Sequence, residues 1–319
     1  TLPYNPPGDY DDVPAFCQQF LVWLHKMHEE VVSAGVWKDA IHAYLAAVAF
    51  ADAQLGKFLD AMDRADAWDD TTLVVWSDHG YHLGDKAVWG KFTQWDQATN
   101  APLLIVDADH GRPGRVVETP VSLMDLFPTV TDLAGVSDHG ARDGRSLVPL
   151  MDDPDARWDG FAGSIIDGMV SLRTPAFRYI LALDGSEQLY QMRRDPGQVT
   201  NLADERDEAH QIDLLRARAL SELDRLGAIL DLRGDTLHGG DGNDILWVSP
   251  NIERAHGGDG GDTYLGFAGR EIREKEDGGF DTLRVFAHEA GTVVRLRVPD
   301  NVERVEAYRT LAAPLDAAA

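Results

Sequence analysis

The sequence predicts an α/β protein built from three consecutive parts. We expect an α/β core over residues 1–150, a small antiparallel sheet with a closing helix over residues 151–229, and a glycine-rich repeat over residues 230–319. Three observations lead to this division. Long helical patterns precede short apolar strands, alternating runs follow from about residue 168, and glycine then recurs with a nine-residue period.

The charge balance argues against two classes of partner. The chain carries 54 acidic and 29 basic residues, a formal charge of −25. Nonspecific binding to nucleic acid or to an anionic membrane needs a basic surface, so we expect neither. Apolar stretches such as Tyr44–Phe50 are far shorter than the roughly 20 residues that cross a bilayer. The single cysteine, Cys17, excludes an intramolecular disulfide.

The first part alternates helices with strands. Apolar residues at three- and four-residue spacing predict helices over 15–34 and 39–66. The continuous apolar runs 71–76 and 101–106 are typical of strands in a sheet that is covered on both faces. Ser122-Leu-Met-Asp125 has the spacing of a capping box, with Asp in place of Glu, and predicts a helix that ends at Gly135.

The second part is predicted as antiparallel. Short alternating runs at 169–172, 178–182 and 188–190 are separated by turn residues. An amphipathic helix over 214–226 follows and is expected to pack on this sheet.

Two segments of the third part repeat one pattern. Gly239-Gly-Asp-Gly-Asn-Asp-Ile-Leu246 and Gly257-Gly-Asp-Gly-Gly-Asp-Thr-Tyr264 both fit G-G-x-G-x-D-x-U-x, where U is a large apolar residue, and they lie 18 residues apart. Glycine allows a tight turn with positive φ, the aspartates offer carboxylate oxygens, and the apolar residue can fill a stacked core. A Gly/Asp-rich surface linker is the alternative.

These segments resemble the hemolysin-type (RTX) calcium-binding repeats. The resemblance implies a parallel β-roll with Ca²⁺ between turns one coil apart, held by Asp241, Asp244, Asp259 and Asp262. The opposite edge, with Asp235 and Glu253, is expected to bind poorly. The stretches 277–283 and 301–305 resemble a segment that follows such repeats and are expected to cap the roll.

A second group of polar residues follows the first predicted strand. Ser77-Asp78-His79-Gly80 comes directly after it, and ligands in open α/β sheets bind at the carboxyl ends of strands. Adjacent Asp and His side chains can both reach one cation. Lys91 comes after a glycine-containing loop, and its ammonium suits a sulfate or phosphate group. An ordinary loop pair and a solvated lysine are the alternatives.

The passage from Thr71 to Lys91, followed by Ala101-Pro-Leu-Leu-Ile, resembles the C-terminal half of a sulfatase of the alkaline-phosphatase superfamily. Iduronate- and choline-sulfatases are the closest in character. Supporting motifs include Ser122-Leu-Met-Asp-Leu-Phe-Pro-Thr129 and Thr200-Asn-Leu202, so the resemblance covers roughly residues 1–228. It implies part of a mixed sheet flanked by helices.

The resemblance also implies a role for each motif residue. Asp78 and His79 would bind the active-site divalent metal, Ca²⁺ or Mg²⁺, and Lys91 would contact the sulfate. His82 would either line the substrate pocket or serve only the loop. The family reaction is hydrolysis of a sulfate ester by a formylglycine nucleophile, with a sulfated small molecule or glycan as substrate.

The nucleophile motif of that family, C/S-x-P-S-R, is absent from the 319 residues. Cys17 lies inside a predicted helix and is expected to be a buried apolar residue. Asp11-Asp12 follow a Pro/Gly stretch rather than a strand, so the metal-binding role of the family's paired aspartates is not transferred to them. We expect the chain to be the C-terminal part of a longer sulfatase and to be inactive alone.

Two other functions remain open at this point. One is a non-catalytic extracellular calcium-binding protein that retains a sulfatase-like remnant, and the other is a phosphatase or phosphodiesterase of the same superfamily. The repeats also bear on location. Extracellular calcium modules bind at about 10⁻⁴–10⁻³ M and therefore fill outside the cell. The resemblance implies a secreted bacterial protein, exported by type I secretion machinery that reads its C-terminus.

Overall fold

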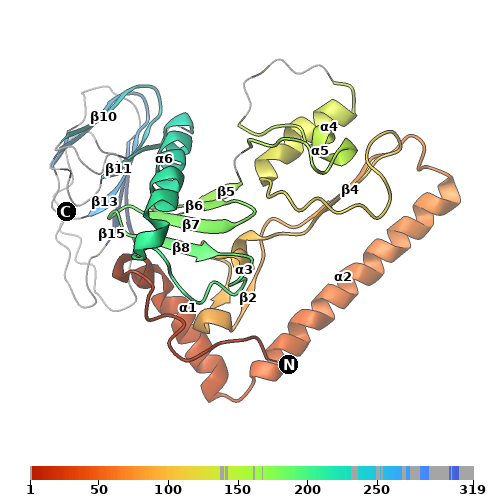
Figure 1. The fold of residues 1–319 in the computed structure, drawn as a ribbon, viewed down its shortest axis with the longest axis horizontal. Coiled ribbons are helices and arrows are strands. Elements are labelled where there is room, and N and C mark those ends of the chain that lie inside the picture. Colours follow the sequence, from red (N-terminus) through yellow and green to blue (C-terminus); the bar gives the residue numbers. More distant parts are fainter. Residues whose placement is uncertain are drawn as a thin grey trace. The chain divides into compact units, whose positions relative to one another are not determined.

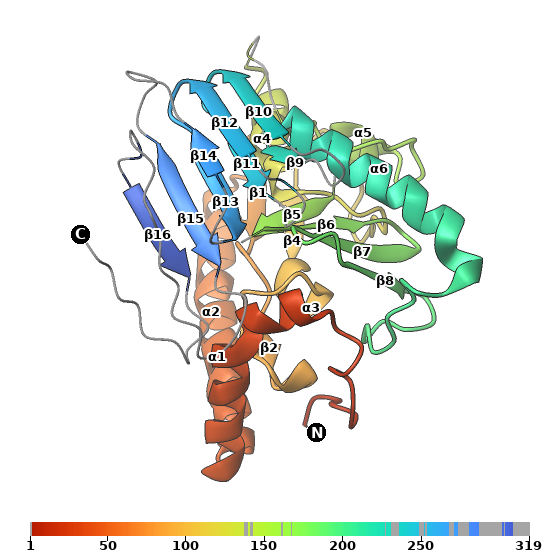
Figure 2. The same cartoon turned by 90° about the vertical axis from the view of Figure 1, so that its left-hand side faces the viewer.

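The computed structural model forms two compact units. The first comprises Thr1–Pro7, Leu24–Gly163 and Arg173–Pro175, and the second comprises Gly8–Trp23, Ser164–Leu172 and Ala176–Ala319. Figures 1 and 2 show the order of elements along the chain. The structure describes residues 2–136, 140, 143–160, 162–166, 168–226, 228–230, 236–248, 252, 254–267, 271–273, 281–286, 302 and 304–308.

The first unit contains the predicted helices and strands in the predicted order. Helix α1 (Ala15–Ser33) begins in the second unit and ends in the first, and it is followed by α2 (Trp37–Ala65). Strands β1 (Leu73–Trp76) and β4 (Leu103–Val106) pair antiparallel in a two-stranded sheet. No residue of either strand is fully buried, although the sequence predicts a covered sheet. No described helix is long and apolar enough to span a membrane.

A small hairpin lies between β1 and β4 in the chain. Strands β2 (His82–Leu83) and β3 (Trp89–Gly90) pair antiparallel around the 3₁₀ turn η1 (Asp85–Ala87), and the short helix α3 (Asp96–Thr99) follows. Trp37 of α2 donates its indole N–H to the Leu83 carbonyl over 2.7 Å. A Cβ atom on Gly84 would lie 2.4 Å from the Trp37 ring. The hairpin is therefore fitted to α2 at a position where only glycine is accommodated.

The predicted capping box is present. The Ser122 hydroxyl accepts from the Met124 N–H, and the Asp125 carboxylate accepts from the Ser122 N–H over 2.8 Å, at the start of η2 (Leu123–Asp125) and α4 (Leu126–Leu133). Asp125 also accepts from the Arg145 N–H, shortly before α5 (Val148–Asp152). One buried carboxylate thus joins two segments of the chain.

The second unit contains the predicted antiparallel elements. Strands β5 (Gly163–Ile166), β6 (Met169–Arg173), β7 (Phe177–Ala182) and β8 (Glu187–Gln191) follow one another across one sheet, and β7 pairs antiparallel with β8. Helix α6 (Ala209–Arg225) contacts β7 and buries one apolar face. Cys17 is buried in α1, as expected, and burial raises the pKa of its thiol to about 12.

The C-terminal strands alternate between two parallel sheets (Figure 2). Neighbouring strands are offset by 18 residues, since Thr236 pairs with Arg254 and Ile245 pairs with Thr263. The first sheet has the order β10-β12-β14 and the second β16-β15-β13-β11-β9. Their bounds are β9 (Ala228–Leu230), β10 (Thr236–Asp241), β11 (Ile245–Val248), β12 (Arg254–Asp259), β13 (Thr263–Phe267), β14 (Glu271–Arg273), β15 (Thr282–Phe286) and β16 (Arg304–Tyr308).

The apolar positions of the repeat fill the space between these sheets. Leu246 and Tyr264 are buried in one cluster with Leu237, Ala255 and Leu283. The segments expected to act as a cap contribute β15 and β16, which continue the larger sheet in parallel. Asp235, Glu253 and the stretch 277–280 lie outside the described residues.

Replacing Asp125 with Ala is expected to lower the free energy of unfolding by about 2 kcal/mol, because two backbone N–H groups lose their acceptor. Chemical denaturation monitored by far-UV circular dichroism measures this. Asp109→Ala, at an exposed position, is the matched control and should change little. Equal stability of both variants would contradict this role of Asp125.

Candidate functional site

The chain leaves β1 in a turn fixed by backbone contacts. The Ser77 N–H donates to the Pro102 carbonyl, and the Gly80 N–H donates to the Ala98 carbonyl over 2.7 Å. A Cβ atom at Gly80 would lie 2.2 Å from the Gln97 carbonyl oxygen. The glycine is required here because the chain passes against the backbone of α3. Asp78 and His79 are thereby held at the carboxyl end of the strand.

Three of the predicted site residues come together at this end. Lys91 Nζ lies 2.7 Å from His79 Nε2 and 4.0 Å from Asp78 Oδ2. The Asp78 oxygen is 3.4 Å from the same His79 nitrogen. The Asp78 side chain is 67% exposed, and the other two are partly buried. The site is therefore accessible to a solute.

The hydrogen bonds assign the tautomer of His79. Its Nδ1 atom lies 2.6 Å from the Gly80 carbonyl oxygen, which can only accept, so Nδ1 carries the proton. The lone pair of Nε2 then accepts from the Lys91 ammonium. An imidazole lone pair and a carboxylate oxygen converge beside one cationic group. This arrangement can hold a divalent metal through Asp78 and His79 and an anion through Lys91.

The two donors do not form a complete metal site. Within the described part of the chain, no group of three or more His, Cys, Asp or Glu side chains is arranged to hold a metal ion. Asp78 and His79 fit a metal as two members of a larger ligand set. The remaining ligands would have to come from elsewhere.

His82 has a different environment from the other three predicted residues. It is fully buried, its Nδ1 atom lies 2.5 Å from the Asp85 carboxylate, and its Nε2 atom lies 2.7 Å from the Thr93 hydroxyl. These contacts connect both ends of the hairpin that leads to Lys91. Both ring nitrogens are engaged within the hairpin, so His82 serves to position the loop in this arrangement.

Sequence reasoning missed the partners of His82. Asp85 also accepts from the Leu83 N–H. Burial raises the pKa of Asp85, but the hydrogen bond and charge interaction with His82, together with the Leu83 N–H, outweigh burial and bring this pKa below its ordinary value. The neighbouring Lys86 is buried, with its ammonium 4.9 Å from the centre of the Trp95 ring. No spacing rule in the sequence identifies these contacts.

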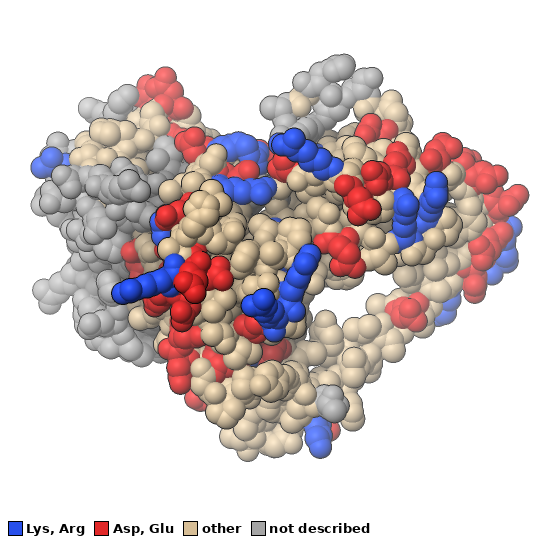
Figure 3. Space-filling view, viewed as in Figure 1, with Lys and Arg blue, Asp and Glu red and all other residues tan. Residues whose placement is uncertain are grey.

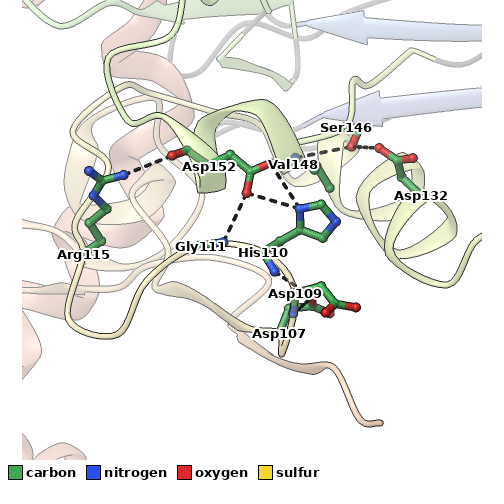
Figure 4. A network of polar contacts seen from close by, with 9 residues as sticks. All are labelled: Asp107, Asp109, His110, Gly111, Arg115, Asp132, Ser146, Val148 and Asp152. Carbon is green, nitrogen blue, oxygen red and sulfur yellow. Dashed lines mark hydrogen bonds and ion pairs between the residues drawn. The ribbon is translucent and has the colours of Figure 1, made fainter. Parts of the chain in front are cut away.

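A further polar network lies at the other end of the β1–β4 pair (Figure 4). The His110 ring contacts the Asp152 carboxylate at 3.2 Å, and Asp107 accepts from the His110 N–H. Asp107 also accepts from Thr72, which precedes β1, and this hydrogen bond is the main cause of a lowered pKa. The antiparallel register places Val106 opposite Leu73, so the network is remote from Asp78. It fastens the loop after β4 to α5.

The proposed calcium residues fall into two pairs in the second unit. Asp241 and Asp259 are register partners in β10 and β12, and both are exposed. The Asp244 N–H donates to Asp262 Oδ1 over 2.9 Å. The remaining oxygens, Asp244 Oδ2 and Asp262 Oδ2, are buried and accept no hydrogen bond.

Burial raises the pKa of both carboxyls, and the charge of Asp244 raises that of Asp262 further. A cation beside these oxygens would compensate both effects, so this donor set fits Ca²⁺. Asp281 extends the series, because its Oδ1 accepts from the Asp262 N–H over 2.8 Å. The sequence analysis did not include Asp281, which follows Asp262 after 19 residues rather than 18.

Comparison with known proteins bears on the first site. Residues 3–136 match the family model of the sulfatases. The match contains Asp78, His79, His82 and Lys91. The chain is 33% identical over 190 residues to a sulfatase of Formosa agariphila, covering 59% of this chain and 37% of the relative. It is 32% identical over 169 residues to a choline-sulfatase of Rhizobium meliloti, covering 51% of this chain and 33% of the relative. The chain thus spans about a third of the length of these relatives.

Solved structures show the same likeness in the fold. A 2-O GAG sulfatase superposes with a TM-score of 0.60 at 22% identity, over 70% of this chain and 52% of the other. A phosphonate monoester hydrolase of Silicibacter pomeroyi superposes with a TM-score of 0.50 at 29% identity, over 55% and 38%. The first likeness concerns the fold alone. Together with the family match, these findings support a hydrolase of the sulfatase type by resemblance.

Replacing Asp85 with Asn should make stability less sensitive to acid. A carboxyl whose pKa is lowered by folding stabilises the protein above its ordinary pKa of 3.8, and that contribution is lost as the pH falls through the lower, folded value. Urea denaturation between about pH 5 and 3 should therefore show a shallower loss in Asp85→Asn than in the parent. Asp109→Asn should follow the parent. A parallel loss in all three proteins would contradict the inferred role of Asp85.

Proposed function

We propose that the chain is part of a sulfatase that hydrolyses sulfate esters. The observation that carries this proposal is the convergence of Asp78, His79 and Lys91 at the end of β1. The family match over residues 3–136 supports it. The substrate class follows from the same chemistry and is a sulfated small molecule or glycan.

Each residue has a distinct task in this proposal. Lys91 binds an oxygen of the sulfate group and offsets the negative charge that builds up as the ester bond breaks. Asp78 and His79 hold a divalent metal, Ca²⁺ or Mg²⁺, which when bound polarises the same group. The Gly80 carbonyl keeps the Nε2 lone pair of His79 directed outward. The buried His82–Asp85 pair maintains the hairpin that delivers Lys91.

The 319 residues do not supply every group that the reaction needs. They contain no C/S-x-P-S-R segment from which a formylglycine nucleophile could form. We therefore propose that the nucleophile and the other metal ligands belong to residues outside this sequence, and that the chain alone is catalytically silent. The short coverage of the relatives supports this view.

A second candidate function is hydrolysis of phosphonate or phosphate esters. The phosphonate monoester hydrolase structure is the specific observation that favours it. Lys91 and a divalent metal would serve either anion, because both present oxygens around a tetrahedral centre. A non-catalytic calcium-binding protein is the remaining alternative.

A chimera tests the enzymatic proposal. We would fuse the stretch of the Formosa agariphila sulfatase upstream of the matched region to the N-terminus of this chain. In the chimera, Lys91→Ala should lower kcat/KM for 4-nitrophenyl sulfate by roughly 10²–10³-fold, as expected for loss of one group that stabilises transition-state charge. Lys26→Ala, an exposed lysine of α1, should leave it unchanged.

The unfused chain should show no turnover of this ester. Turnover by the unfused chain, or equal loss in both lysine variants, would contradict the proposed site. A chimera that prefers 4-nitrophenyl phenylphosphonate would favour the second candidate.

We further propose that the C-terminal strands form a calcium-binding β-roll of the RTX type. The 18-residue register and the buried oxygens of Asp244 and Asp262 support this. Asp241 and Asp259 would contribute from the exposed side of the same turns. Such a module fills at extracellular calcium concentrations, so the proposal includes secretion by a bacterium, with type I secretion machinery as partner.

Calcium should stabilise the chain through these carboxylates. At a concentration about 100 times the dissociation constant, one site adds about 2.7 kcal/mol to the free energy of unfolding. Thermal denaturation in 10 mM CaCl₂ and in EDTA measures the effect, which should shrink strongly in Asp262→Asn. Asp213→Asn, on the exposed face of α6, is the control. Identical melting with CaCl₂ and EDTA would contradict the calcium proposal.

A further inference from the structure

The middle of α2 is apolar on every side and yet exposed. All twelve residues from 43 to 54 are exposed, and ten of them are apolar. Phe50 is 68% exposed, and Leu45 and Val48 are also among the exposed large residues. Within the described part of α2, only Met62 is buried. Because a helix that is apolar all round is normally surrounded by protein, this segment is expected to have a cover.

The strand pair that follows α2 has the same property. Leu104 and Trp76 are 52% and 51% exposed, and Val106 is also exposed. Both strands are continuous apolar runs, a composition typical of strands buried on both faces of a larger sheet. A two-stranded pair cannot provide that burial and is marginally stable by itself.

We propose that residues 43–54 of α2 and the β1–β4 pair form one docking surface, here called the open face. Its occupant is the part of a sulfatase-type α/β domain that these 319 residues lack. The inference rests on the proposed function and adds the surface through which the two parts assemble. In Figure 3 the middle of α2 is mostly uncharged, and charged side chains gather toward its C-terminal end.

Two observations favour this occupant over a second copy of the chain. A second copy would dock as a preformed surface and cover one side of α2, whereas the exposed residues of the helix surround it. Covering all sides requires a segment that folds around the helix. In addition, the curated relatives are much longer than the matched region, which itself contains the whole open face. They therefore possess residues enough to cover it.

Hydrogen exchange measured by mass spectrometry tests the proposal on the unfused chain and on the chimera described above. Peptides covering 43–54 should exchange at least roughly tenfold more slowly in the chimera, because buried helices open less often. Peptides from α6 should exchange equally in both proteins. Val48→Asp should reverse the protection of α2 in the chimera, whereas Leu214→Asp, at an exposed apolar position of α6, should not.

Two results would overturn the inference. One is unchanged exchange of residues 43–54 in the chimera. The other is a discrete dimer of the unfused chain, seen by light scattering, in which these residues are already protected. The enzymatic proposal has a separate readout. Protection of α2 without ester hydrolysis retains the docking surface and removes the sulfatase function, and hydrolysis with an unprotected α2 does the reverse.

Discussion

The hydrogen bond from the Lys91 ammonium to His79 Nε2 is the interaction on which the rest of the first unit depends. It requires β1 to end at residue 76 and the chain to turn against α3 at Gly80. It also requires the hairpin to return so that position 91 faces position 79. Trp37, Asp85 and the His82 ring serve that second condition. The surrounding structure is thus organised to hold one cation beside two lone-pair donors.

Much of the fold follows from periodicity. The spacing of apolar residues located α1 and α2 within a few residues, and the capping box located α4, because these signals are local. The 18-residue repeat also predicted the register of the C-terminal strands and the burial of Leu246 and Tyr264. The cover of β1 and β4 could not be obtained this way. Apolar runs report the burial a strand needs, not whether the same chain supplies it.

The site was predictable to the extent that its residues are neighbours in sequence or follow a strand. Asp78 and His79 are adjacent at a strand end, and Lys91 was placed by resemblance. The environment of His82 was not predictable, because its partners Asp85 and Thr93 meet it only after the hairpin closes. A histidine in a loop has the same appearance in the sequence whether it faces a ligand or the interior. Asp281 escaped for a simpler reason, since its spacing departs from the repeat.

The most direct test of the account is the protonation pattern of the His79 ring. Long-range ¹H–¹⁵N NMR correlation on the unfused chain near pH 8 reports which ring nitrogen carries the proton. The account predicts a proton on Nδ1, and an Nε2 resonance that shifts when Lys91 is replaced by Met. A proton on Nε2, unaffected by Lys91→Met, would show that the ammonium and the imidazole do not meet.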